Sequence, residues 1–257
     1  MRIASASFVG AVAAMGLASA PSLAAHSRAS KLPGVAPARG TGHTATGLHP
    51  LASGMPRSST VGGYIVTPAE GITSASSTFK LPSKATCTDS NGAAVLLGLD
   101  VPGSGGGDDA WAQVAIGCGV NGVMTVGSPS GTVANADASL GDRVETRIVE
   151  TPGGATIATV DDLTKGQVIT SNGTINSADS QVILGSEILS TGDGTLEKFS
   201  SPVAFSGVEV GGLDWSQTSP APSPFALVLT GSKPQIVPSK VPAKASSTFT
   251  LTENATS

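Results

Sequence analysis

Alternation of apolar and polar residues is the dominant pattern along the chain after residue 57. The run 143–150 (RVETRIVE) alternates over most of its length, as a strand does when only one face lies in a core. The run 93–100 (AAVLLGLD) is mostly apolar and has the length of a buried strand. The same criteria predict strands at 63–67, 76–81, 111–117, 122–126, 155–160, 166–170, 181–189, 202–210, 224–230 and 247–253.

Glycine, proline, asparagine and aspartate separate almost all of these runs, and no helical period follows residue 25. The composition agrees, because 33 Gly, 17 Pro and only 12% charged residues favour strands and turns over a charged disordered chain or a coiled coil. We therefore predict an all-β fold, an antiparallel sandwich or barrel.

The N-terminus predicts export. Arg2 precedes an apolar run at 8–20, too short to cross a bilayer but typical of a secretory signal, and Ser22-Leu23-Ala24 is an A-x-A-like cleavage site. We expect a signal peptide at 1–25, a basic pro-segment or linker at 26–57, and one domain at 58–257. No later run has the length of a membrane span, so we expect no membrane partner.

The positions of the histidines and of the charged residues exclude several kinds of catalytic site and of partner. All three histidines, His26, His43 and His49, lie in the segment that we expect to be removed. The remaining domain would then lack a Ser-His-Asp triad, a Cys-His pair and any imidazole zinc site. Residues 58–217 contain 17 acids and 6 bases, which disfavours nucleic acid as a partner.

The two cysteines, Cys87 and Cys118, are predicted to form one disulfide in an exported chain. Closing that loop would stabilise the fold by roughly 3.7 kcal/mol in the chain-entropy model. A nucleophilic thiol is disfavoured, because the domain offers no histidine base.

Carboxylates, amides and hydroxyls remain as chemical groups. Glu187 is a lone acid in the apolar run 181–189, and Gln113 lies in the run 111–117. Burial disfavours the charged form of a carboxylate, so a buried Glu187 could act as general acid or base. Alternation equally permits the plainer interpretation, a strand residue facing solvent. The pairs 108–109 and 161–162 (both DD) read as solvated turns rather than calcium ligands.

Ordered short motifs give the chain a resemblance to a known family. They are 59–64 (STVGGY), 77–82 (STFKLP) followed by Cys87, 96–100 (LLGLD), Gly141-Asp142, 162–166 (DLTKG), 186–189 (SEIL) and the tail from Phe225. Together they resemble the glutamic peptidases, or eqolisins, especially the secreted bacterial members. The resemblance covers residue 58 to the C-terminus.

The resemblance implies two bent antiparallel sheets with the active site on the concave face. Glu187 would be the general base that activates water, and Gln113 would position that water and stabilise the oxyanion. Asp100 would be a supporting acid near the substrate. Trp111, two positions from Gln113, shares its strand face and would line the site. The implied partner is a polypeptide cut by a monomer with no metal or cofactor.

Several aromatic positions of the family pattern differ here. Leu96 and Ile188 stand where the family has Trp, and 122–129 (GVMTVGSP) contains no aromatic residue. Two alternatives therefore stay open beside the peptidase. One is an inactive relative that binds peptide or glycan on the same face, and whether Glu187→Gln changes any activity discriminates it from the peptidase. The other is an unrelated structural β-sandwich, which a disulfide pattern other than Cys87–Cys118 would favour.

Overall fold

The computed structural model describes residues 54–58, 61–86, 95–101, 110–116, 122–128, 133–151, 154–174, 181–188, 198–228 and 235–253 of the 257-residue chain. Within these ranges the regular structure is β-strand apart from one short 3-10 helix at Trp215–Gln217. The predicted all-β fold is confirmed. None of the helical structure in these ranges is long and apolar enough to cross a membrane.

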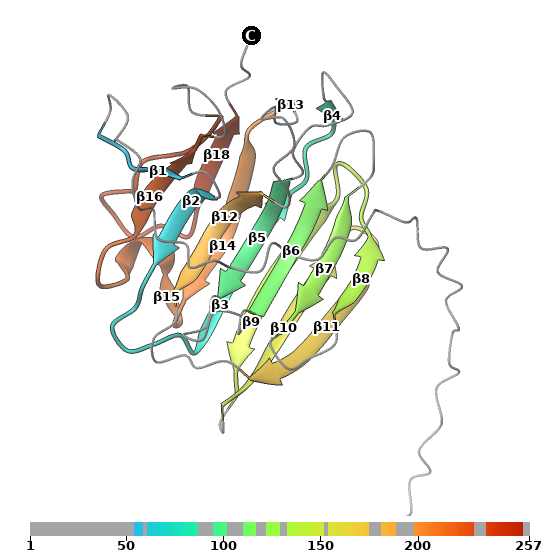
Figure 1. Ribbon diagram of the computed structural model, residues 1–257, viewed down its shortest axis with the longest axis horizontal. Helices are drawn as coiled ribbons and strands as arrows, with labels where there is room; N and C mark the ends of the chain where they lie inside the picture. Colours follow the sequence, from blue (N-terminus) through green and yellow to red (C-terminus); the bar gives the residue numbers. More distant parts are fainter. Residues whose placement is uncertain are drawn as a thin grey trace, which may run out of the picture. The chain divides into compact units, whose positions relative to one another are not determined.

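The strands follow one another through the domain, and Figure 1 labels them in chain order. They are β1 (Arg57–Ser58), β2 (Val61–Val66), β3 (Ser74–Lys80), β4 (Ala85–Thr86), β5 (Val95–Val101), β6 (Ala110–Ile116), β7 (Val123–Gly127), β8 (Ala134–Asp137), β9 (Arg143–Glu150), β10 (Ala155–Asp162), β11 (Gln167–Thr174), β12 (Val182–Ile188), β13 (Lys198–Phe199), β14 (Val203–Val210), β15 (Leu213–Asp214), β16 (Ser223–Leu227), β17 (Ile236–Pro238) and β18 (Phe249–Glu253).

One hydrogen-bonded ladder links most of these strands and folds back on itself. Its order is β11-β10-β9-β3-β14-β18-β17-β16-β2-β12-β5-β6-β7-β8. Every pair along this path is antiparallel. The half from β2 to β8 forms one layer, and β3, β9, β10 and β11 form the layer behind it (Figure 1), with β6 in contact with β9 and β10. The result is a two-layer sandwich.

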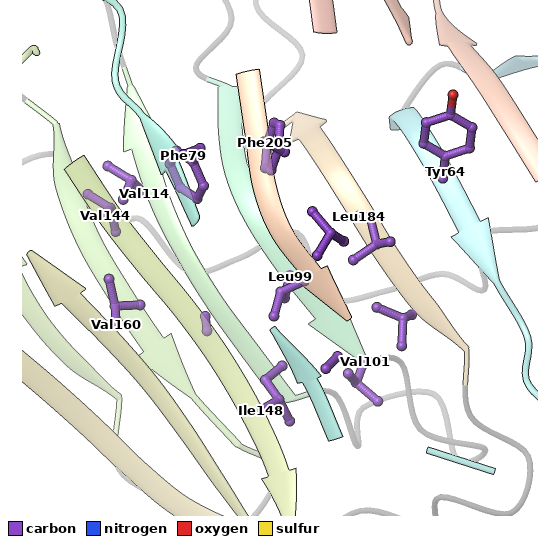
Figure 2. Close-up of a cluster of buried hydrophobic side chains, with 14 of the residues drawn as sticks. Tyr64, Phe79, Leu99, Val101, Val114, Val144, Ile148, Val160, Leu184 and Phe205 are labelled. Atoms are coloured by element: carbon purple, nitrogen blue, oxygen red, sulfur yellow. The ribbon is translucent and has the colours of Figure 1, made fainter. Parts of the chain in front are cut away.

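The core lies between the two layers and is built by alternation. Leu99, Val114 and Leu184 project from the first layer toward Phe79 and Val144 of the second (Figure 2), and all five side chains are buried. Aromatic rings close one end of the core, with Phe205 stacked on Phe249 at 4.5 Å between ring centroids.

Tyr64 belongs to the same aromatic cluster and lies 4.4 Å from Trp215 between ring centroids. Its hydroxyl donates a hydrogen bond to the Ser239 carbonyl oxygen. Burial raises the pKa of Tyr64 to about 12, against a smaller opposing effect of that hydrogen bond. Tyr64 and the fully buried Trp215 are therefore core residues.

A charged cluster joins two turns of the second layer. Lys165 Nζ lies 2.6 Å from Asp142 Oδ2 and 3.3 Å from Asp162 Oδ2. Asp162 Oδ1 also accepts the backbone N–H groups of Thr164 and Lys165. The expectation of a solvated turn at Asp161–Asp162 was wrong for Asp162, whose side chain is fully buried because it organises the turn that it begins.

Six short strands were not predicted from the sequence, namely β1, β4, β8, β13, β15 and β17. β8 is four residues of ANAD and β17 ends in Pro238, so neither shows the apolar run or long alternation used to predict strands. By contrast, the strand at 143–150 has the predicted bounds. The proposed domain boundary at residue 58 stays a prediction.

Candidate active site

Gln113 and Glu187 lie on the two strands that flank β5. Gln113 of β6 is in register with Gly98 of β5, and Gly98 is in register with Gly185 of β12. Glu187 follows two positions after Gly185, so it projects from the same face as Gln113. With strands about 4.8 Å apart and residues about 3.4 Å apart, their Cα atoms are separated by roughly 12 Å. Two long side chains can bridge that separation with one small reacting group between them.

This face of β2, β12, β5, β6, β7 and β8, called the site face below, is the one turned away from the core. Val114 and Leu184, which alternate with the site-face residues, belong to the core cluster, whereas the buried Ala115 and Ile183 do not. The site-face side chain of Glu187 is nevertheless only 7% exposed. The plainer interpretation of Glu187 as a solvent-facing strand residue is therefore wrong.

Gln113 is a buried polar residue whose side-chain oxygen can still accept a hydrogen bond. Its side chain is 4% exposed, and its Oε1 atom has no hydrogen-bond partner among the described residues. A buried amide oxygen without a partner costs stability, and such groups gather at functional sites. The amide can accept a hydrogen from a water or ligand at Oε1 and donate from Nε2.

A row of glycines crosses the middle of the site face. Gly63, Gly185 and Gly98 are in register on β2, β12 and β5, next to Gln113 on β6. A Cβ atom at Gly98 would lie 2.4 Å from the Ala112 carbonyl oxygen, so only glycine fits there. The row gives the site face a strip of bare backbone between Gln113 and the far strands. Glycine within a strand-like run is a sequence signal of close backbone approach, and it could have pointed to this row.

Asp100 and Trp111 occupy the next row. They are in register on β5 and β6, and Trp111 is in register with Gly127 on β7. A Cβ atom added to Gly127 would fall 2.2 Å from Trp111 Cζ2, so the indole ring occupies the space that a side chain would need. Asp100 is 6% exposed, whereas Trp111 is only half-buried. Trp111 thus shares the strand face of Gln113, as their spacing in the sequence predicts.

The site face becomes more accessible toward β7 and β8. Thr125 is in register with Gln113 and is buried, but its own partner Asn135 on β8 is exposed. Asp137, in the row of Glu187, is exposed as well. Sequence reasoning missed this polar continuation because β8 was not predicted.

The remaining predicted sites add little to this picture. No group of three or more His, Cys, Asp or Glu side chains gathers in the described ranges in a way that could hold a metal ion. Cys87 and Cys118, and the pair at 108–109, lie outside the described residues. The disulfide stays a prediction.

Comparison with known proteins rests on the fold. No protein-family model and no curated protein matches the sequence. Among solved structures, scytalido-glutamic peptidase bound to a peptide-based transition-state analog aligns with a TM-score of 0.54 at 16% identity, covering 76% of this chain and 98% of that one. SCP-B, a member of the eqolisin family of peptidases in complex with the tripeptide Ala-Ile-His, aligns with a TM-score of 0.53 at 17% identity and the same coverage.

The chain has a glutamic-peptidase-like fold. At this identity the likeness concerns the fold, and it agrees with the family resemblance of the short sequence motifs. The chemistry has to be argued from the residues on the site face.

Proposed function

We propose that the protein is an acid endopeptidase that hydrolyses polypeptides with Glu187 and Gln113. The observation that carries the proposal is their placement on one face, on the strands either side of β5, across a position that has no side chain. A glutamic-peptidase-like fold supports the same assignment.

The reaction follows from the two side chains. The Glu187 carboxylate takes a proton from water as the water oxygen attacks the peptide carbonyl carbon. The carbonyl oxygen becomes negatively charged and accepts a hydrogen bond from Gln113 Nε2, while Oε1 accepts a hydrogen from the attacking water. Glu187 then gives its proton to the amide nitrogen, the C–N bond breaks, and a carboxylic acid and an amine leave.

The row of glycines suits a polypeptide substrate. A peptide that crosses the strands above Gly185 and Gly98 meets backbone rather than side chains, so its scissile bond can approach Gln113. The burial of Glu187 and Gln113 limits competing bulk water, which strengthens hydrogen bonds to a developing charge. In this proposal the chain is exported, processed before residue 58, held by a Cys87–Cys118 disulfide, and monomeric.

One observation favours a second candidate function. Trp111 is the only tryptophan in the described strands of the site face, and Leu96 and Ile188 stand where the family resemblance expects Trp. Aromatic walls exclude water and hold substrate side chains, so their loss favours an inactive relative that binds a peptide or glycan on this face.

The test is digestion of a denatured protein at about pH 3.5, near the ordinary carboxyl pKa. We expect Glu187→Gln to lower kcat/KM on the order of a thousandfold, because it removes the general base. The matched control is Glu145→Gln on β9, an acid of the other layer, which should keep full activity. Equal cleavage by the wild type and Glu187→Gln would refute the assignment. No cleavage by any folded form would favour the binding module.

A further inference from the structure

We propose that residues 56–58 belong to the folded domain and position Glu187, so that proteolytic processing leaves a chain that begins at or before Pro56. The role toward Glu187 rests on the proposed function, whereas the starting point of the processed chain does not. The inference comes from the hydrogen bonds of β1, the pairing of β2 with β12, and the burial of the side chains between them.

The backbone of residues 56–58 is hydrogen-bonded into the sheet. The Pro56 carbonyl oxygen accepts the Ala226 N–H at 3.0 Å, and the Ser58 carbonyl oxygen accepts the Val228 N–H at 2.9 Å. These bonds pair β1 in parallel with β16, a strand far along the chain. Because Ala226 and Val228 are buried, a chain that began after Ser58 would leave two buried N–H groups without acceptors.

The side chain of Ser58 fixes the start of β2. Its Oγ atom accepts a hydrogen bond from the Val61 N–H at 3.0 Å. Both residues are buried, so the loss of this acceptor would leave a buried donor unpaired. Since β1 is itself bonded to β16, Ser58 holds the first residue of β2 at a fixed place relative to β16.

Val61 is the neighbour of Glu187 on the site face. The two residues are register partners on β2 and β12. Tyr64 and Val66 of β2 belong to the core cluster, so alternation turns Val61 to the face from which Glu187 projects. Directly opposite residues have Cβ atoms roughly 5 Å apart. The buried isopropyl group of Val61 therefore lies beside the buried side chain of Glu187.

Close packing couples the start of β2 to the strands on both sides. A Cβ atom added to Gly62 would lie 2.9 Å from Ile236 Cγ2 and 2.9 Å from Leu227 Cβ. On the other side, Ser186 Oγ donates a hydrogen bond to the Gly62 carbonyl oxygen at 2.9 Å. Interiors packed this closely transmit small displacements. A shift at the start of β2 is therefore passed to β12 at the position of Glu187.

Arg57 allows the start of the domain to be tested directly. Its side chain is half-buried, and its Nε atom is shielded from solvent. An arginine-specific protease is added to the full chain, and mass spectrometry follows the products. We expect the Arg57–Ser58 bond to be cut at least about a hundredfold more slowly than in a peptide of residues 52–63, because β1 must open first. Equal rates, or a folded product that begins at Ser58, would overturn the inference.

Substitution of Ser58 tests the positioning of Glu187. Ser58→Ala should lower kcat for peptide hydrolysis about tenfold, because the general base is displaced from the reacting water. KM should change by less than about twofold, since the residues that contact the substrate are unchanged. Ser58→Thr keeps a hydroxyl oxygen and should recover most of the lost kcat. Each variant is assayed at a temperature at which circular dichroism shows it to be folded.

The matched control removes an equivalent hydrogen bond elsewhere. Ser216 Oγ accepts the Ser246 N–H at 3.0 Å, the same distance as for Ser58 and Val61. Ser216→Ala should leave kcat unchanged. An unchanged kcat in folded Ser58→Ala, or an equal loss in Ser216→Ala, would overturn the positioning role. Should Ser58→Ala fail to fold, the rate of cleavage after Arg57 in the wild type still decides whether β1 belongs to the domain.

The outcomes separate this inference from the proposed function. Peptidase activity that depends on Glu187, with rapid cleavage after Arg57 and full activity of the shortened chain, would overturn the inference alone. A protected Arg57–Ser58 bond in a folded protein that cleaves no polypeptide would overturn the proposed function, and with it the role toward Glu187. The start of the domain at or before Pro56 would then stand by itself.

Discussion

Two groups of buried acids differ in the strands and turns that surround them. In the turns of the second layer, Asp142 and Asp162 share Lys165, which the chain itself supplies at 2.6 and 3.3 Å. On the site face, Asp100 and Glu187 lie in a layer whose strands contain no basic residue. In the first group the cation comes from the same turn as one of the acids, because Lys165 follows Asp162 by three positions.

The difference teaches how to separate structural from functional carboxylates. A carboxylate that caps a turn and pairs with a nearby lysine fixes backbone geometry, and its role is complete within the fold. Acids that lie on one sheet face beside a buried amide and bare backbone are instead candidates for chemistry on a ligand. Both kinds are buried, so burial alone does not distinguish them.

The largest loss of stability is expected from a substitution at Gly98, where the backbone of the site face is tightly packed. At Gly98 the φ angle is +151°, and an added Cβ would lie 2.4 Å from a backbone oxygen of β6. Gly98→Ala should therefore lower the free energy of unfolding by about 4 kcal/mol, since both strain and a clash oppose it. Urea denaturation followed by circular dichroism measures the change.

The matched control is a glycine in the turn that contains Asp142. Gly141 precedes Asp142, has a φ angle of +90°, and would place an added Cβ in open space. Gly141→Ala should cost only about 1 to 2 kcal/mol from backbone strain. Equal costs for the two substitutions would contradict the close approach of β5 and β6 at Gly98.

The fold was predictable because its strands are long and alternate. The run RVETRIVE fixes both the bounds of β9 and its buried residues, among them Val144 and Ile148. The four polar and small residues of β8 give no such signal, since an edge strand is selected by its neighbour β7 rather than by its own propensity. Sequence pattern therefore found the sheets and missed part of their edge.

The site was predictable only in part. Resemblance singled out Gln113 and Glu187, but alternation allowed Glu187 to face either way. The decisive fact is that β12 pairs with β5 and β2, a long-range register that no local pattern encodes. The same holds for Asp162, which reads as a surface turn until the turn containing Asp142 is packed against it.

A smaller loss of stability is expected when the charged cluster of Lys165, Asp142 and Asp162 loses its cation. Lys165→Met leaves Asp142 and the fully buried Asp162 without their shared partner. We expect the free energy of unfolding at about pH 7 to fall by about 2 kcal/mol, less than for a fully buried pair because Lys165 is 38% exposed. The control Lys80→Met removes an exposed lysine of β3 and should change stability by less than about 0.5 kcal/mol. Equal effects of the two would contradict the cluster's role.

The smallest expected effect is the pH dependence of the stability difference between wild type and Lys165→Met. It tests directly whether the acids of the turns are held charged by Lys165. Burial alone would raise the pKa of Asp142, but the hydrogen bonds from Lys165 Nζ and the Ser139 backbone N–H outweigh it and hold that pKa below its usual range. A carboxyl whose pKa is lowered by folding contributes stability above its unfolded pKa of about 3.9, and this is lost as the pH falls through the lower folded value.

The stability difference between wild type and Lys165→Met should therefore hold from about pH 7 to about pH 5 and fall below about 0.5 kcal/mol by about pH 2. Urea midpoints across that range measure it. A difference lost already at about pH 5, or unchanged at about pH 2, would contradict the lowered pKa of Asp142. Because that pKa is lowered, the ion pair between Lys165 and Asp142 persists to a lower pH than a carboxyl with its ordinary pKa would allow.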